Sequence, residues 1–189
     1  MKLLLASKSP RRRELLSQLG FPVDYISIDV DEHIDAALPS DMVAEHLACR
    51  KADAFTGSLS DCEVLVTADT VVVHRGNVLG KPADRSQAFA MLRELSGERH
   101  TVYTGVCLRS NNDRCSFTEA TDVLFNRLDE SDIEYYVDRY RPFDKAGAYG
   151  IQEWIGMVGI GSIEGCYYNV MGLPVARLYT TLKNRFLSM

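Results

Sequence analysis

Hydrophobic residues along the chain recur at two different spacings, which predict strands and helices in alternation. Aliphatic runs such as KLLLA (2–6), FPVDYISIDV (21–30) and EVLVTADTVVV (63–73) are typical of strands. Apolar residues spaced three and four apart predict amphipathic helices between these runs. Strands that alternate with helices, with at least one hairpin, predict an α/β fold built on a mixed, twisted sheet flanked by helices.

Capping residues mark where several of the predicted helices begin and end. Ser9 as N-cap and Pro10 as first helical residue predict a helix that is closed by Gly20. Asp84 and Gln87 form a candidate capping box for another helix. Helices are therefore expected over residues 10–19, over 40–56 with Ser40 as the N-cap, from 85 to Gly97, near 130–140 and from about 174.

The remaining pattern predicts a hairpin, two further strands and a glycine-rich segment. HRGNVLGKP (74–82) is expected to turn back on the preceding strand, and strands are expected near 101–109 and 115–128. The glycine-rich stretch 147–165 is expected to be irregular or a bulged strand. Because no repeat and no long linker divides the chain, a single domain is expected over residues 1–189.

Composition narrows the functional classes. The net charge of −5 argues against a broad basic surface for nucleic acid, so any positive potential has to be local. Five cysteines, an odd number without C-x-x-C spacing, and no signal peptide indicate a reduced, cytoplasmic protein with free thiols. No apolar run reaches the roughly 18 residues that a membrane span needs, so no membrane partner is expected.

Three consecutive arginines, Arg11 to Arg13, occupy the first turn of the helix that Ser9 caps. A helix N-terminus is already positive, and each cation there costs about 0.3 to 1 kcal/mol. At about 100° per residue, Arg12 shares the apolar face of this helix. One interpretation is a solvated basic turn. The other is an anion site, in which free N–H groups and the hydroxyls of Ser7 and Ser9 help to bind phosphate.

Lys51 presents the same problem in the helix expected over 40–56. It projects close to the middle of an apolar face, with Arg50 at the edge. Its amine either extends to solvent or meets an anion. Two inward cations on separate helices suggest a single polyanionic ligand.

Asp69 is a carboxylate inside the apolar run LVTADTVVV. Burying it unpaired is prohibitive, so it either meets cations or a metal, or is a structural residue at a bulge. The acidic stretch DVDEHID (29–35) fails as an EF-hand because Ile34 stands at the sixth position. Alone it is typical of a solvated loop. Together with Asp69, its Glu32 is a candidate ligand for a hard divalent cation that also binds phosphate oxygens.

Several familiar phosphate and catalytic motifs are excluded. GNVLGKP is one residue short of a Walker loop and ends in Pro82. GIGSIEG has its third glycine one residue late for a dinucleotide fingerprint. There is no G-x-S-x-G elbow, and the four histidines show no metal-ligand spacing.

Four motifs occur in order along the chain: ASKSPRRRELL, ADTVV followed by GKP, KAGAYGIQ, and VMGLP. Together they resemble the Maf family of nucleotide pyrophosphatases over essentially the whole chain, and their joint occurrence is specific. The resemblance implies a fold similar to the inosine triphosphate pyrophosphatases, bilobed with a central cleft, and a cytoplasmic homodimer. GIQEWIG departs from the family by placing Glu153 and Trp154 where small residues are common.

The resemblance also implies an activity, the hydrolysis of a nucleoside triphosphate to the monophosphate and pyrophosphate with Mg²⁺, Mn²⁺ or Co²⁺. AYGIQ resembles the branch that acts on dTTP and UTP. Arg12, Thr70 and Gln152 match the family's specificity positions, and Asp69 matches its proton acceptor. Combined with the chemistry above, the predicted site residues are Asp69, Lys51 and Lys81 for catalysis, Ser7, Ser9, Arg11, Arg12, Thr70 and Gln152 for substrate binding, and Glu32 and Asp69 for metal.

Other interpretations stay open at this point. The substrate is a canonical or a modified pyrimidine triphosphate, or alternatively N7-methyl-GTP. Gln152 either offers an amide donor and acceptor to the base or ties down a loop. A protein of another class, a non-catalytic nucleotide-binding regulator of cell division, would bind dTTP without turnover. Release of pyrophosphate from a nucleoside triphosphate distinguishes an enzyme from such a regulator.

Overall fold

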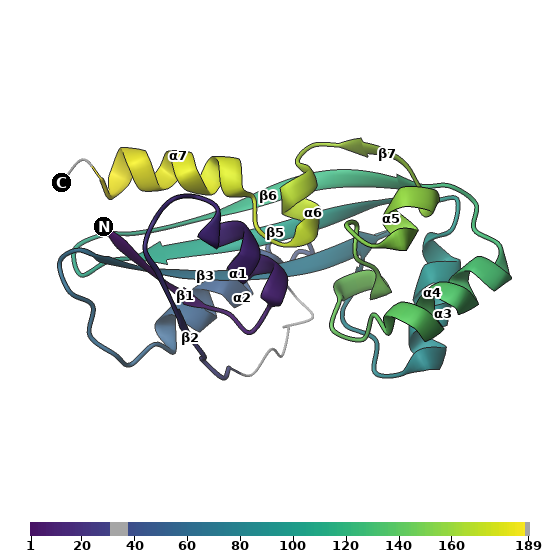
Figure 1. Cartoon of the computed structure of the whole chain (residues 1–189), viewed down its shortest axis with the longest axis horizontal. Helices are drawn as coiled ribbons and strands as arrows, with labels where there is room; N and C mark the ends of the chain where they lie inside the picture. Colours follow the sequence, from purple (N-terminus) through teal and green to yellow (C-terminus); the bar gives the residue numbers. More distant parts are fainter. Residues whose placement is uncertain (31–37, 188–189) are drawn as a thin grey trace. The chain divides into compact units, whose positions relative to one another are not determined.

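The structure is a computed structural model that describes residues 1–30 and 38–187 (Figure 1). The chain divides into two compact units. Unit 1 comprises Met1–Asp69, Thr104–Glu119 and Gly172–Met189, and unit 2 comprises Thr70–Tyr103 and Ala120–Met171. Each unit is thus built from segments that are far apart in the sequence. The single domain expected over the whole chain stays a prediction.

Three long strands supply residues to both units: β3 (Glu63–His74), β5 (Arg99–Arg109) and β6 (Arg114–Phe125). Unit 1 also contains β1 (Lys2–Ala6), α1 (Pro10–Ser17), β2 (Val23–Ile26), α2 (Val43–Asp53) and α7 (Val175–Arg185). Unit 2 also contains β4 (Asn77–Leu79), α3 (Arg85–Leu95), α4 (Glu130–Tyr140), the 3-10 turn η1 (Ala146–Ala148), α5 (Trp154–Gly159), β7 (Ile160–Glu164) and α6 (Tyr167–Met171).

The strands pair in both directions. β1 runs parallel to β2 and to β3, so that Leu3 lies opposite Val23 on one side and Val64 on the other. β4 pairs antiparallel with β3, and β7 pairs antiparallel with β6. Hydrogen bonding orders the strands β2-β1-β3-β5-β6-β7, with β4 beside β3. The predicted α/β fold with a mixed sheet and flanking helices is confirmed, and so is the hairpin after β3.

In unit 1, α2 approaches β5 so closely that backbone meets backbone. A Cβ atom at Gly105 would lie 2.2 Å from the amide nitrogen of Glu45 and 2.3 Å from the carbonyl carbon of Ala44. Only glycine fits such an approach. The apolar side of α2 then packs into a buried cluster that comprises Leu4, Ala6, Ala48, Ala52, Leu59, Leu65 and Cys107. The position of α2 over the strands is therefore fixed, together with its polar side chains.

In unit 2, α3 and α4 lie side by side (Figure 1). Asp84 caps α3 by accepting the N–H of Gln87 at 2.8 Å, and the Gln87 side chain accepts the N–H of Ala83 at 2.6 Å. The predicted capping box is thus present, with its return bond one residue earlier. The helices pack on a core whose largest fully buried side chains are Leu92, Leu95, Phe125, Ile133, Tyr136 and Ile155.

The start of α2 and the extent of β2 differ from prediction. Ser40 is not the N-cap of α2, because Ser40 and Met42 belong to a turn in which the Met42 N–H donates to the Pro39 carbonyl at 2.9 Å. The helix therefore begins at Val43, with Met42 at the capping position. The strand expected over 21–30 is also shorter, since only Val23–Ile26 pairs with β1.

The glycine-rich stretch 147–165 is more ordered than predicted. It contains α5, which buries Ile155, and the strand β7. The expected bulge is present as a register shift against β6 between Leu124 and Phe125. The helices α5 and α6 were missed. The glycines of α5 lower its helix propensity, and both helices are so short that they depend on packing that the local sequence does not reveal.

Two further expectations can be compared with the structure. All five cysteines are free thiols, as their odd number and spacing predicted. Within residues 1–30 and 38–187, no helix combines the length and the apolar character that crossing a bilayer requires.

Candidate active site

The turn from β1 into α1 is organised by two serine hydroxyls. Ser9 is the N-cap, and its hydroxyl accepts the N–H of Arg12 at 3.5 Å, with Pro10 in the first helical turn. The buried Ser7 hydroxyl accepts the N–H of Ser9 at 3.1 Å. Both oxygens thus act as acceptors here, and each hydroxyl still has a proton to donate. The predicted start of α1 is confirmed.

Arg12 points inward from α1, as its helical angle predicted. Its Nε donates to the carbonyl of Gly172 at 2.7 Å, and its Nη1 donates to the carbonyl of Ala68 at 2.9 Å. These bonds tie the helix to β3 and to the start of the C-terminal segment, a structural role that the sequence did not reveal. The second bond also brings the guanidinium to the residue next to Asp69.

The neighbouring arginines are placed differently. Arg11 is half-buried in the same turn. Arg13 donates from Nε to the carbonyl of Ser7 at 3.0 Å, and its guanidinium lies over the Tyr25 ring, 5.1 Å from the centroid. Arg13 therefore stabilises the turn itself, whereas Arg12 reaches toward β3.

Lys51 and Asp69 form an ion pair of 2.5 Å between α2 and β3. Their side chains are only 15% and 12% exposed. The alignment of α2 along β3 has a local cause, because the Thr67 hydroxyl donates to the Ala48 carbonyl at 2.7 Å. One helical turn after Ala48 and two strand positions after Thr67 bring Lys51 and Asp69 to the same face. The inward cation of α2 thus meets the buried carboxylate of β3.

The predicted site residues divide between the two units. Ser7, Ser9, Arg11, Arg12, Lys51 and Asp69 belong to unit 1, whereas Thr70, Lys81 and Gln152 belong to unit 2. Thr70 follows Asp69 directly in β3 and is half-buried, while Lys81 and Gln152 are exposed. Glu32 lies outside the described residues. In unit 1, the interactions of Arg12 and Lys51 bring two predicted cations to the stretch of β3 around Asp69.

The described carboxylates fit a divalent cation only together with a bound phosphate. Among the residues that the structure describes, no three His, Cys, Asp or Glu side chains gather to hold a metal ion. Asp69 nevertheless offers a hard oxygen donor. Mg²⁺ is usually held by one or two carboxylates plus substrate phosphates rather than by a cage of protein ligands. The donor set therefore suits a cation that binds together with a phosphate.

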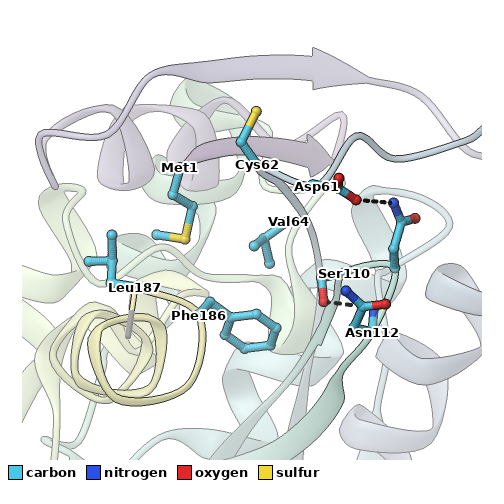
Figure 2. Close-up of a pocket in the computed structure, with 9 residues that line it drawn as sticks. Met1, Asp61, Cys62, Val64, Ser110, Asn112, Phe186 and Leu187 are labelled. Atoms are coloured by element: carbon cyan, nitrogen blue, oxygen red, sulfur yellow. Dashed lines mark hydrogen bonds between the residues drawn. The ribbon is translucent and has the colours of Figure 1, made fainter. Parts of the chain in front are cut away.

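A pocket of about 270 Å³ in unit 1 does not coincide with these residues (Figure 2). Its apolar lining includes Met1, Val64 and Phe186, and polar groups of Asp61 and Ser110 lie at its edge. No predicted site residue lines it. The cations and Asp69, rather than this pocket, mark the candidate active site.

Comparison with known proteins agrees with the motifs. A family model described as Maf-like protein matches residues 2–185. The chain belongs to the Maf family. It is 52% identical to a dTTP/UTP pyrophosphatase of Bacteroides thetaiotaomicron over 185 residues, which cover 96% of this chain and 95% of the relative. A dTTP/UTP pyrophosphatase of Parabacteroides distasonis is 48% identical over 97% of this chain and 95% of its own length.

The fold of this Maf-family chain is also found in a solved structure of low sequence identity. The Staphylococcus aureus Ham1 protein superposes with a TM-score of 0.54 at 13% identity, over 97% of this chain and 98% of that chain. At this identity the likeness concerns the fold alone. The similarity to a Ham1 fold agrees with the architecture expected from the family resemblance.

Proposed function

We propose that this Maf-family chain is a nucleoside triphosphate pyrophosphatase that hydrolyses dTTP and UTP to the monophosphate and pyrophosphate. The observation that carries the proposal is the shielded Lys51–Asp69 pair, with Arg12 bonded to the residue before Asp69. A shielded carboxylate with one cation paired to it and a second bonded to the preceding residue suits chemistry on a polyanion. Relatives named dTTP/UTP pyrophosphatase, 48% to 52% identical over nearly the full length, support the choice of substrate.

In this proposal the turn before α1 binds the phosphate chain. Ser7 and Ser9 donate their hydroxyl protons, and Arg11 and Arg12 supply positive charge at a helix N-terminus, where free backbone N–H groups add further donors. A bound phosphate also offsets the unfavourable placement of cations in the first helical turn. Lys81 holds charge that develops on the departing pyrophosphate.

Asp69 has the central chemical role. Its carboxylate accepts a proton from water while the water oxygen attacks the α-phosphorus. The bond between the α-phosphorus and the bridging oxygen breaks, and pyrophosphate leaves with the bond electrons. Lys51, 2.5 Å from the carboxylate, orients it and adds positive charge beside the reacting phosphate.

We include a divalent cation, Mg²⁺, Mn²⁺ or Co²⁺, in the proposal, held by Asp69, by Glu32 and by substrate oxygens. When bound, the cation neutralises negative charge on the phosphates. Recognition of the nucleobase is assigned to Gln152, whose amide offers a donor and an acceptor to a uracil or thymine ring. Thr70 is included as a second specificity residue.

A cytoplasmic location and a homodimer also belong to the proposal. Five free thiols agree with a reducing compartment, and the family resemblance supports the dimer. Light scattering of the purified chain measures the oligomeric state directly. A monomeric mass at micromolar concentration would remove the dimer from the proposal and leave the chemistry unaffected.

Pyrophosphate release from a panel of dTTP, UTP, CTP, GTP and N7-methyl-GTP tests the function, with each of the three cations in turn. The expected result is turnover of dTTP and UTP. A preference for N7-methyl-GTP would reassign the substrate branch, whereas binding of dTTP without turnover would indicate a regulatory protein. Hydrolysis in ¹⁸O-labelled water tests the site of attack. Label in pyrophosphate instead of the monophosphate would contradict attack at the α-phosphorus.

A further inference from the structure

A second polar cluster lies in unit 2, around Glu153. One carboxylate oxygen accepts from the Lys145 amine at 3.1 Å, and the other accepts from the Tyr136 hydroxyl. Lys145 also pairs with Asp144 at 2.7 Å. The Glu153 side chain is 19% exposed and that of Lys145 is 8% exposed, while Tyr136 is fully buried. Removing these charges from water has a desolvation cost, which the ion pair and the hydrogen bonds around Glu153 offset.

The Tyr136 hydroxyl makes two bonds that link α4 to the segment before α5. It donates to Glu153 and accepts the N–H of Gly150 at 3.0 Å. Burial, and next the hydrogen bond to Glu153, raise the pKa of Tyr136 well above its ordinary value, so the hydroxyl keeps its proton. The protonated hydroxyl therefore donates to Glu153 while its oxygen accepts the N–H of Gly150.

Gly150 is the point at which this cluster meets Gln152. A Cβ atom at position 150 would lie 2.9 Å from the Glu153 carboxyl carbon, 3.0 Å from the Gln152 amide nitrogen and 3.0 Å from Lys145 Cε. The exposed Gln152 side chain thus lies against the same glycine that Tyr136 holds. Because an amide presents a donor on one side and an acceptor on the other, a rotation of this side chain changes what it offers to a base.

We infer that Tyr136, Lys145 and Glu153 form a positioning network that fixes the Gln152 amide for reading a pyrimidine base. The inference rests on the proposed function, since it needs Gln152 to contact the base. The network gives the glutamate at position 153 a defined role in this chain. A carboxylate there accepts from both Lys145 and Tyr136, which a small side chain cannot do.

Tyr136→Phe is the sharpest test, because it removes only the hydroxyl and keeps the ring in the core. We expect the ratio of kcat/KM for dTTP over CTP to fall by about tenfold, mainly through a higher KM for dTTP. Tyr140→Phe is the matched control. Tyr140 stacks on Tyr136 from the next turn of α4, with ring centroids 5.1 Å apart, and this variant should keep the wild-type ratio.

Glu153→Gln and Lys145→Arg complete the series. Glu153→Gln loses the negative charge and should lower the dTTP/CTP ratio. Lys145→Met removes the cation and should also lower this ratio, whereas Lys145→Arg keeps a cation and should retain most of the wild-type ratio. Circular dichroism confirms folding of each variant. A purely structural network would lower the activity on all nucleotides equally, and that result would overturn the inference.

Gln152→Ala separates this inference from the proposed function. If Gln152→Ala loses the preference for dTTP and the network variants do not, the positioning role is wrong and the base assignment stands. If Gln152→Ala keeps the preference, the base assignment is wrong and the inference fails with it. Wild-type protein without any dTTP turnover would overturn both.

Discussion

The Nζ atom of Lys51 lies 2.5 Å from the Asp69 carboxylate, and both side chains are largely shielded from water. The two residues are 18 positions apart in the sequence, and their opposite charges join α2 to β3. Asp69 does not lie unpaired in its apolar strand. The pairing connects the residue proposed as the base to the cation proposed to assist it.

Asp69→Asn keeps the shape of this side chain and removes its capacity as a base. We expect dTTP binding to stay within a few-fold of wild type while kcat falls at least about 100-fold, the usual contribution of a general base. Isothermal titration with dTTP in Ca²⁺ and steady-state turnover in Mg²⁺ measure the two effects. A folded Asp69→Asn protein with wild-type kcat would exclude Asp69 as the base.

Lys51 and Asp69 should be energetically coupled in the folded protein. Each single change, Lys51→Met or Asp69→Asn, leaves one charged or polar partner in a shielded place and should destabilise the fold. The double variant should be more stable than the sum of the two single changes predicts, with a coupling of about 0.5 to 3 kcal/mol. Urea unfolding of the four proteins gives this value. Strict additivity would show that the contact contributes nothing to stability.

Arg12 has a structural role beside its proposed role in phosphate binding. Arg12→Ala loses the bonds to the carbonyls of Gly172 and Ala68 and should lower the free energy of unfolding by about 1.5 to 3 kcal/mol. Activity should fall as well. Arg12→Lys keeps the charge but cannot reproduce both bonds, so it should recover more activity than stability. Equal recovery of activity and stability in Arg12→Lys would contradict the assignment of two separate roles to Arg12.

His100 should make stability depend on pH. It is buried, and desolvation, followed by the charge of His74, lowers its pKa from 6.5 to about 4. Between these values the unfolded chain binds more protons at this position than the folded chain does. The free energy of unfolding therefore falls as pH falls from 6.5 toward 4, by at most about 3 kcal/mol.

The non-titrating variant His100→Gln, whose amide is able to bond the Tyr149 hydroxyl as the imidazole does, should flatten this dependence. Urea unfolding at half-unit steps between pH 4.5 and 7.5 measures the slope. His46→Gln, at an exposed histidine, is the control and should keep the wild-type slope. Equal slopes in all three proteins would show that His100 does not contribute.

Cys49 should react as a thiolate near neutral pH. The neighbouring Cys107 thiol, with smaller contributions from Ser116 and Arg114, lowers the pKa of Cys49 below that of an ordinary thiol. Because the thiolate is the nucleophile, the alkylation of Cys49 should reach its plateau at a lower pH than that of an ordinary thiol. Cys107→Ala removes the main donor and should move the midpoint upward. Quenched iodoacetamide labelling with mass spectrometry of the Cys49 peptide, with the exposed Cys62 followed in the same digest, measures both midpoints.

Much of the local structure was determined by the sequence itself. Ser9 and Pro10 set the start of α1, and the alternation of apolar runs with helical patterns predicted the mixed α/β sheet. Helical angles predicted that Arg12 and Lys51 point inward, which the structure confirms. These features depend on capping, periodicity and side-chain direction, and all three act within a few residues along the chain.

The tertiary structure alone decided which inward groups meet. The pairing of Lys51 with Asp69 depends on how α2 lies across β3 and β5, and this placement comes from the Thr67 bond to Ala48 and from the close approach at Gly105. No local pattern encodes such a crossing. The network of Tyr136, Lys145 and Glu153 likewise needed α4 to lie beside a segment that follows it in the chain. Contacts between distant segments are set by packing, and packing is a property of the whole fold.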